Sequence, residues 1–109
     1  LDGHPMVGIL GGESENKHKP VRFGYVELEA GEDTLVASKG ARLRGHEFHY
    51  YDCTENGAAF TARRKGSEYR CFAAGQNLVA GFPHIHFYSN LECAATFYKN
   101  CLKAKESRI

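Results

Sequence analysis

The chain has 109 residues, enough for one domain or for a piece of a larger one. Its 42% hydrophobic and 25% charged residues are typical of a globular fold, and a net charge of +1 argues against the broad basic surface that nucleic-acid binding requires. No apolar run approaches the roughly 20 residues of a membrane-spanning helix. The sequence therefore predicts neither a nucleic-acid partner nor a membrane segment.

Many short strands followed by one helix make up the predicted architecture. Short apolar runs and alternating apolar and polar residues, bounded by turn residues, predict the strands. They cover residues 6–10, 21–29, 34–37, 43–51, 58–63, 68–74 and 82–88. Residues 11–20 are rich in breakers and predict an exposed loop. A change of phase near Gly24 predicts a β-bulge, and Lys65-Gly66-Ser67 predicts the turn of a hairpin.

From Leu91 the apolar residues follow a helical period. Ser89 and Glu92 have the spacing of a capping box, and basic residues follow near the end, so we expect a helix of about three to four turns. The side predicted to be apolar carries Leu91, Ala94, Ala95, Tyr98 and Leu102.

Four cysteines stand at positions 53, 71, 93 and 101. An even count is compatible with two disulfides, but no C-x-x-C pair is present and the apolar content suffices for a core without cross-links. Cys93, Phe97 and Cys101 are four residues apart and are expected to share the buried side of the helix. We expect reduced thiols and a cytoplasmic location.

Four of the six histidines fall in two predicted strands. His84 and His86 are two residues apart and should share one face of a strand. Such a pair can bind a metal ion, can hold a catalytic imidazole beside an orienting neighbour, or can be satisfied by backbone groups. His46 and His49 should face opposite sides, and Glu47 could tune a nearby histidine. Spacing alone leaves these alternatives open.

Three ordered motifs extend over most of the chain. They are Arg22-Phe23-Gly24-Tyr25-Val26-Glu27, Leu43-Arg44-Gly45-His46-Glu47-Phe48-His49-Tyr50 and Gly81-Phe82-Pro83-His84-Ile85-His86-Phe87. In residues, order and spacing they resemble the C-terminal part of the glutaminase domain in the cobyrinate a,c-diamide synthase family, which has GYVE, RGHEFHYS and YLHLHF segments. The resemblance implies an α/β or α+β fold, namely the β-rich C-terminal part of a class I glutamine amidotransferase-like domain with a C-terminal helix.

The resemblance also implies a function. Members of the family are ATP-dependent ligases that hydrolyse glutamine and amidate the a and c acetate side chains of cobyrinate in cobalamin biosynthesis. The family's catalytic histidine falls on His84, and we expect His86, His46, Glu47 and His49 to support the glutamine site. Glutamine and a tetrapyrrole would be the partners. ATP and Mg²⁺ would act in the full-length enzyme, no cofactor or metal site is expected in this chain, and exposed strand edges would favour a homodimer.

Two features of the family are missing from the sequence. Neither the G-x-C-x-G nucleophile elbow nor the P-loop synthetase domain is present, so residues 1–109 are expected to be the C-terminal portion of a glutaminase domain, inactive alone. Two alternatives remain. One is diamidation of another tetrapyrrole such as sirohydrochlorin; the other is a stand-alone β-rich metal-binding module that uses His84 and His86.

Overall fold

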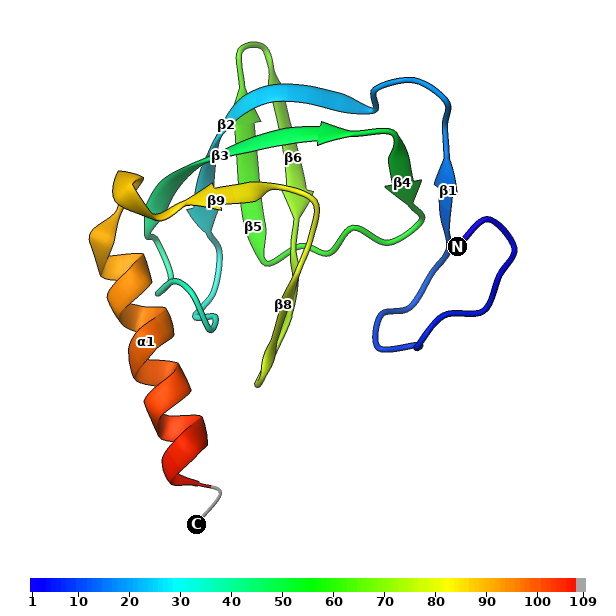
Figure 1. The fold of residues 1–109 in the computed structure, drawn as a ribbon. Helices are drawn as coiled ribbons and strands as arrows, with labels where there is room; N and C mark the ends of the chain where they lie inside the picture. Colours follow the sequence, from blue (N-terminus) through cyan, green and yellow to red (C-terminus); the bar gives the residue numbers. More distant parts are fainter. Residues whose placement is uncertain (108–109) are drawn as a thin grey trace.

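The computed structural model describes residues 1–107, in which a β-rich body is followed by one long helix (Figure 1). The strands are β1 (Ser14–Asn16), β2 (Arg22–Ala30), β3 (Arg42–His49), β4 (Tyr51–Cys53), β5 (Phe60–Arg64), β6 (Ser67–Cys71), β7 (Ala73–Gly75), β8 (Leu78–Ala80) and β9 (His84–His86). A 3₁₀ turn, η1 (Phe87–Ser89), leads into α1 (Leu91–Glu106). This arrangement is compatible with the α+β alternative.

Five antiparallel strands form the main sheet, in the order β6-β5-β2-β3-β9. The long β2–β3 pairing runs from Arg22 opposite His49 to Glu29 opposite Arg42. The β5–β6 hairpin is confirmed, and its turn uses Gly66 at a φ of 76°, a conformation that glycine adopts without steric cost. Two small ribbons, β1–β4 and β7–β8, extend from this sheet (Figure 1).

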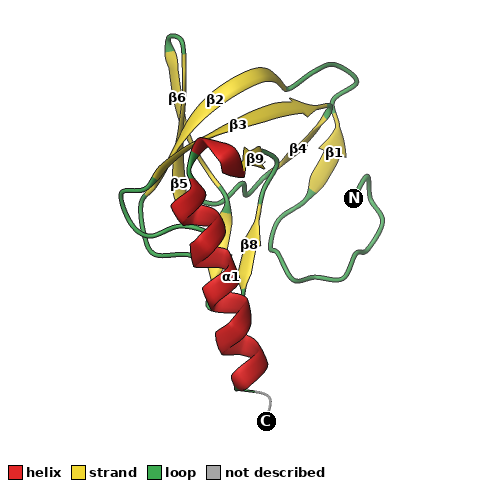
Figure 2. Ribbon diagram, turned by 60° about the vertical axis from the view of Figure 1, so that its left-hand side comes forward, coloured by secondary structure: helices red, strands yellow, loops and turns green. Residues whose placement is uncertain are grey.

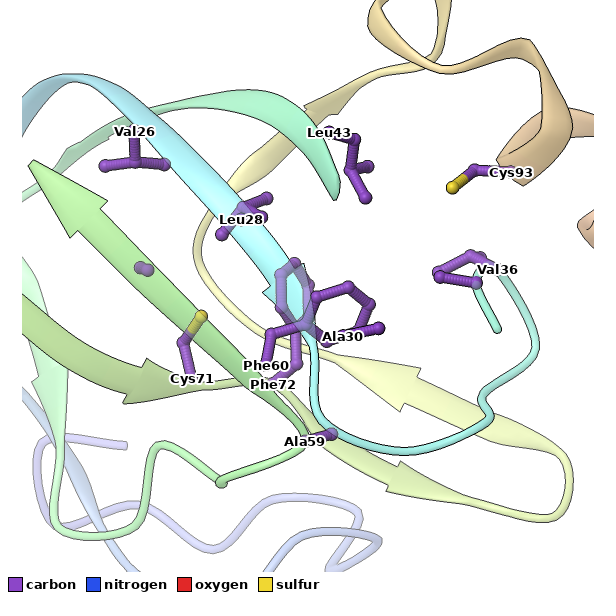
Figure 3. Packing of buried hydrophobic residues seen from close by; sticks show 12 residues of the cluster. Val26, Leu28, Ala30, Val36, Leu43, Ala59, Phe60, Cys71, Phe72 and Cys93 are labelled. Carbon is purple, nitrogen blue, oxygen red and sulfur yellow. The ribbon is translucent and has the colours of Figure 1, made fainter. Parts of the chain in front are cut away.

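The inner face of the main sheet carries the core. Leu28 of β2, Leu43 of β3 and Phe60 of β5 are almost fully buried there. Phe72 lies beside Phe60 with a centroid distance of 5.0 Å, and Cys93 approaches this cluster from α1 (Figure 3). Each such side chain contributes about 1.5–3 kcal/mol through its removal from water, so this face holds the strands together.

The prediction of a bulge at Gly24 in β2 is wrong. Its pairing with β3 passes through Gly24 opposite Glu47 with no inserted residue, although Gly24 has a φ of 119°. Val26 and Leu28 point inward, whereas Phe23 and Tyr25 belong to the exposed outer face. The apparent change of phase therefore reflects aromatic residues on the outer face and not an extra residue.

Several predicted strands are absent or shorter in the structure. Residues 6–10 form no strand, because Gly8 turns at a φ of 84° and the apolar side chains around it are exposed. Residues 34–37 form a loop in which the Thr34 backbone and hydroxyl bond to Ala37, instead of a strand. The predicted loop at 11–20 contains β1, and the predicted strand at 82–88 is reduced to β9.

Helix α1 exists as predicted, but its cap and its buried side differ. The N-cap is Asn90, whose side chain accepts from the Glu92 backbone N–H, and not Ser89. Only Cys93 of the helix is buried; Leu91 and Tyr98 are 64% and 66% exposed. The prediction that Cys101 shares the buried side is wrong, since Cys101 is exposed. Figure 2 shows α1 extending away from the sheet, which explains why it has few core contacts.

The four cysteines are free, in agreement with the predicted thiols. Within residues 1–107, the structure contains no helix with the length and apolar character of a membrane span.

Candidate active site

The predicted His84–His86 pair lies on β9, at one edge of the main sheet. Both imidazoles are exposed, whereas Ile85 between them packs against the core. The alternation of a strand accounts for this arrangement, and the prediction that the two histidines share one face is confirmed. His84 is therefore open to a ligand approaching the outer face of the sheet.

Strand β3 brings two more side chains to the same face. His46 is directly opposite His84 in the antiparallel register, and Arg44 is directly opposite His86. Directly opposed residues on neighbouring strands point to the same side of a sheet. The register therefore gathers three of the predicted histidines, His46, His84 and His86, on one surface.

Gly45 allows β9 to lie this close to β3. A Cβ atom at Gly45 would come within 2.9 Å of the carbonyl oxygen of His84 and 3.1 Å of Leu28. A side chain at this position would push the edge strand outward, and His84 would move with it. The sequence motif contained this glycine, but only the strand register reveals which backbone it accommodates.

These residues line an open groove of about 1030 Å³ on the outer face. Its walls come from β2, β3, β9 and the β5–β6 hairpin, with Tyr25, Glu27, Arg44, His46, Arg63, Arg64, Lys65, His84 and His86 among the lining residues. Arg63 is ion-paired with Glu29 and Glu68, which leaves Arg44, Arg64 and Lys65 against a single lining carboxylate, that of Glu27. The groove therefore favours a ligand that carries negative charge.

The other two predicted site residues, Glu47 and His49, lie on the opposite side of β3. Glu47 is 1% exposed, and its Oε1 is 3.0 Å from Nε2 of His49. Its second carboxylate oxygen accepts a hydrogen bond from the Tyr69 hydroxyl. Nδ1 of His49 is 2.7 Å from the carbonyl oxygen of Tyr51, which can only accept, so Nδ1 is the donor in this contact. The histidine that lies beside Glu47 is therefore His49, on the side of β3 away from His84.

The Glu47–His49 pair still contacts the segment that precedes β9. The ring of His49 stacks on Phe82 at a centroid distance of 4.1 Å and an interplanar angle of 9°. Phe82 is two residues before His84, and Pro83 between them is buried. The pair therefore holds the segment before β9 in place from the inner side of the sheet, but it does not line the groove.

The thiols near the core are poorly suited to nucleophilic chemistry. Burial, reinforced by the Glu47 carboxylate, raises the pKa of the Cys71 thiol to about 12. Burial also raises the pKa of the Cys93 thiol. Because the thiolate is the reactive form, both side chains stay protonated and unreactive at neutral pH. Neither buried thiol can therefore serve as the nucleophile for an imidazole on the outer face.

Among residues 1–107, no three His, Cys, Asp or Glu side chains converge as ligands for a metal ion. Six of the lining residues named above were not anticipated as site residues from the sequence: Tyr25, Glu27, Arg44, Arg63, Arg64 and Lys65. Strand alternation places Arg44 on the same face as His46, so Arg44 could have been identified from the sequence. The contribution of β2 depended on the cross-strand register, which the sequence does not reveal.

The chain is similar to several curated proteins named cobyrinate a,c-diamide synthase. It is 35% identical over 102 residues to the cobyrinate a,c-diamide synthase of Caldanaerobacter subterraneus, a match that covers 90% of this chain and 23% of the relative. The enzyme of that name from Listeria monocytogenes serovar 1/2a is 38% identical over 83% of this chain and 21% of its own length. That of Salmonella typhimurium is 37% identical over 77% of this chain and 20% of its own length.

No protein-family model and no solved structure matches the chain significantly. The chain spans about a fifth of the length of the curated relatives that it matches. The matches nevertheless cover most of its own residues, and they agree with the resemblance of the three motifs. This sequence is homologous to one segment of the cobyrinate a,c-diamide synthases.

Proposed function

We propose that the chain is the part of a glutamine-dependent amidotransferase that supplies the general base of glutamine hydrolysis. The ammonia released would amidate the a and c acetate side chains of cobyrinate. Support comes from the relatives, which are named cobyrinate a,c-diamide synthases, and from the exposed position of His84 in a groove of suitable charge. The observation that carries the proposal is the gathering of His84, His86 and His46 on one open surface.

In the proposed reaction, His84 acts on a cysteine thiol. Its imidazole takes the proton of the thiol, and the thiolate attacks the side-chain amide carbon of glutamine. As the carbon–nitrogen bond breaks, the imidazolium returns the proton to the departing nitrogen, and ammonia leaves. Water then hydrolyses the thioester to give glutamate and the free thiol. His86 and His46 orient the His84 ring and the substrate.

The nucleophile belongs to another part of the enzyme in this proposal. The pKa values of Cys71 and Cys93 are raised by burial in the core, and neither Cys53 nor Cys101 lines the groove. ATP with Mg²⁺ would activate the acetate carboxylate by phosphorylation, so that ammonia can displace phosphate. We assign no residue of this chain to that step. The isolated chain is therefore expected to have no glutaminase activity.

A substitution of His84 in the full-length enzyme tests the proposal. His84→Ala should reduce glutamine-dependent amidation by at least about 100-fold, because general base catalysis contributes that much or more. Amidation with added ammonia should stay near the wild-type rate, since ammonia bypasses the glutaminase step. Both rates are measured by the conversion of cobyrinate to its diamide.

His4→Ala is the matched control, because His4 is exposed in the N-terminal segment and remote from the groove residues. It should leave both rates unchanged. Loss of the ammonia-dependent rate in His84→Ala would indicate a structural role for His84. Retention of the glutamine-dependent rate would exclude His84 as the base.

A further inference from the structure

Two oppositely charged side chains in the groove lie side by side without bonding to each other. Glu27 of β2 is directly opposite Arg44 of β3, and both are exposed on the outer face. Among the described residues, neither side chain has a hydrogen-bond or ion-pair partner; Arg44 uses only its backbone N–H, which bonds to Ser89. An arginine and a glutamate are therefore both free to bind a ligand.

Three other arginines near the groove already have partners. Arg63 donates to Glu29 at 2.6 Å and to Glu68 at 3.0 Å. Arg64 donates to the carbonyl oxygen of Phe23, and Arg42 lies 3.6 Å from Glu29. Glu27 and Arg44 therefore differ from Arg63 and Arg64, the two lining arginines whose guanidinium groups are already bonded within the protein.

Arg44 and Glu27 lie close enough to His84, the proposed base, for one ligand to contact all three. Arg44 is directly opposite His86, so it is the diagonal neighbour of His84, and such neighbours are roughly 7–8 Å apart. The long Arg44 side chain spans part of this separation. A ligand bound by Arg44 and Glu27 can therefore extend across β3 and place a second functional group at the His84 imidazole.

We propose that Arg44 and Glu27 form the subsite for the α-carboxylate and the α-ammonium group of glutamine. This inference rests on the proposed function of His84. The guanidinium of Arg44 binds the carboxylate through two parallel hydrogen bonds, and the carboxylate of Glu27 accepts from the ammonium group. The two methylene groups of glutamine then carry its amide towards His84. The subsite selects a free amino acid, because both charges of the α carbon are recognised.

Binding of ligands to the whole chain tests the subsite directly. The probes are L-glutamine, glutaramic acid, which lacks the α-amino group, and L-glutamine α-amide, which lacks the α-carboxylate. Each is titrated while the imidazole C–H signals of His84 and His86 are followed by NMR. Wild-type protein should bind each truncated probe about tenfold more weakly than glutamine, because each loses a charged hydrogen bond.

The variants should remove these preferences one at a time. Arg44→Gln should bind glutamine about tenfold more weakly and no longer distinguish it from the α-amide. Glu27→Gln should no longer distinguish glutamine from glutaramic acid. Arg42→Gln is the control, because Arg42 lies on the same face of β3 but does not line the groove, and it should bind as wild type does. Circular dichroism verifies that each variant is folded.

Three outcomes would overturn the subsite: no saturable shift with glutamine, unchanged preferences in Arg44→Gln and Glu27→Gln, or equal effects of Arg42→Gln and Arg44→Gln. The proposed function fails by a different result, namely full glutamine-dependent amidation in the His84→Ala enzyme. The two failures are distinguishable, since the binding preferences depend on α-group contacts and the amidation rate depends on the imidazole.

Discussion

At the scale of single residues, Glu47 is a carboxylate that is almost completely removed from water. It is 1% exposed, and its two carboxylate oxygens face His49 and the Tyr69 hydroxyl. Glu47→Gln keeps the size of the side chain but removes the charge from these hydrogen bonds. We expect it to lower the free energy of unfolding by about 2 kcal/mol, the cost of losing hydrogen bonds to a charged group. Urea denaturation at neutral pH measures the change.

Glu32→Gln is the control for this prediction, because Glu32 is exposed in a loop. Its effect should stay within about 0.5 kcal/mol, as for most surface substitutions. Equal effects of the two substitutions would contradict the importance of the buried pair. If Glu47→Gln increases the mobility of the Phe82 ring more than Glu32→Gln does, the result would agree with the stacking of His49 on that ring.

The face of each histidine within its own strand could be predicted from the sequence, but not which residues of the two strands share a side of the sheet. Strand alternation correctly separated His46 from His49 and placed His84 with His86. It did not reveal that Glu47 and His49 lie across the sheet from His84, because that depends on the register in which β3 pairs with β9. A period of two gives the face of a residue within its own strand and leaves the partner strand undetermined.

At the scale of elements, the start of α1 shows how local signals compete. Ser89 and Glu92 fit a capping box, yet the Ser89 hydroxyl bonds to the carbonyl oxygen of His86 and accepts from the Arg44 backbone N–H. Asn90 takes the capping role and also donates to the carbonyl oxygen of Arg42. Both side chains therefore attach the start of the helix to β3. These long-range contacts cannot be predicted from the residues around the cap alone.

The cap makes a measurable contribution to stability. Asn90→Ala removes the acceptor for the Glu92 backbone N–H and the bond to Arg42, so we expect a loss of about 1–2 kcal/mol in the free energy of unfolding. Thr96→Ala is the control within the same helix, because the Thr96 hydroxyl bonds only to the Glu92 carbonyl oxygen one turn earlier. It should be neutral or slightly stabilising, since alanine is the better helix former. Urea denaturation followed by circular dichroism at 222 nm compares the two variants, and an equal loss in both would contradict the cap.

At the scale of the whole molecule, the β-rich body with a C-terminal helix could be predicted, but not the extent of its exposed apolar surface. Phe23, Tyr25, Phe48 and Tyr50, which we call the outer aromatic cluster, are between 41% and 83% exposed. Phe23 and Phe48 contact each other edge to face at 5.2 Å. Aromatic residues are usually buried, but the alternation of β2 and β3 turns Phe23, Tyr25 and Phe48 to the outer face.

The outer aromatic cluster should make the isolated chain self-associate. Exposed contiguous apolar patches favour contacts between molecules, and the neighbouring β9 has a free edge that adds unpaired backbone groups. Phe48→Lys places a charge in the middle of the cluster, so the weight-average mass at high protein concentration should fall towards that of the monomer. Sedimentation equilibrium measures this mass.

Leu102→Lys is the matched control, because Leu102 is 40% exposed on α1 against 47% for Phe48. If both variants dissociate the chain equally, the helix takes part in the contact; if neither does, the outer aromatic cluster does not drive association.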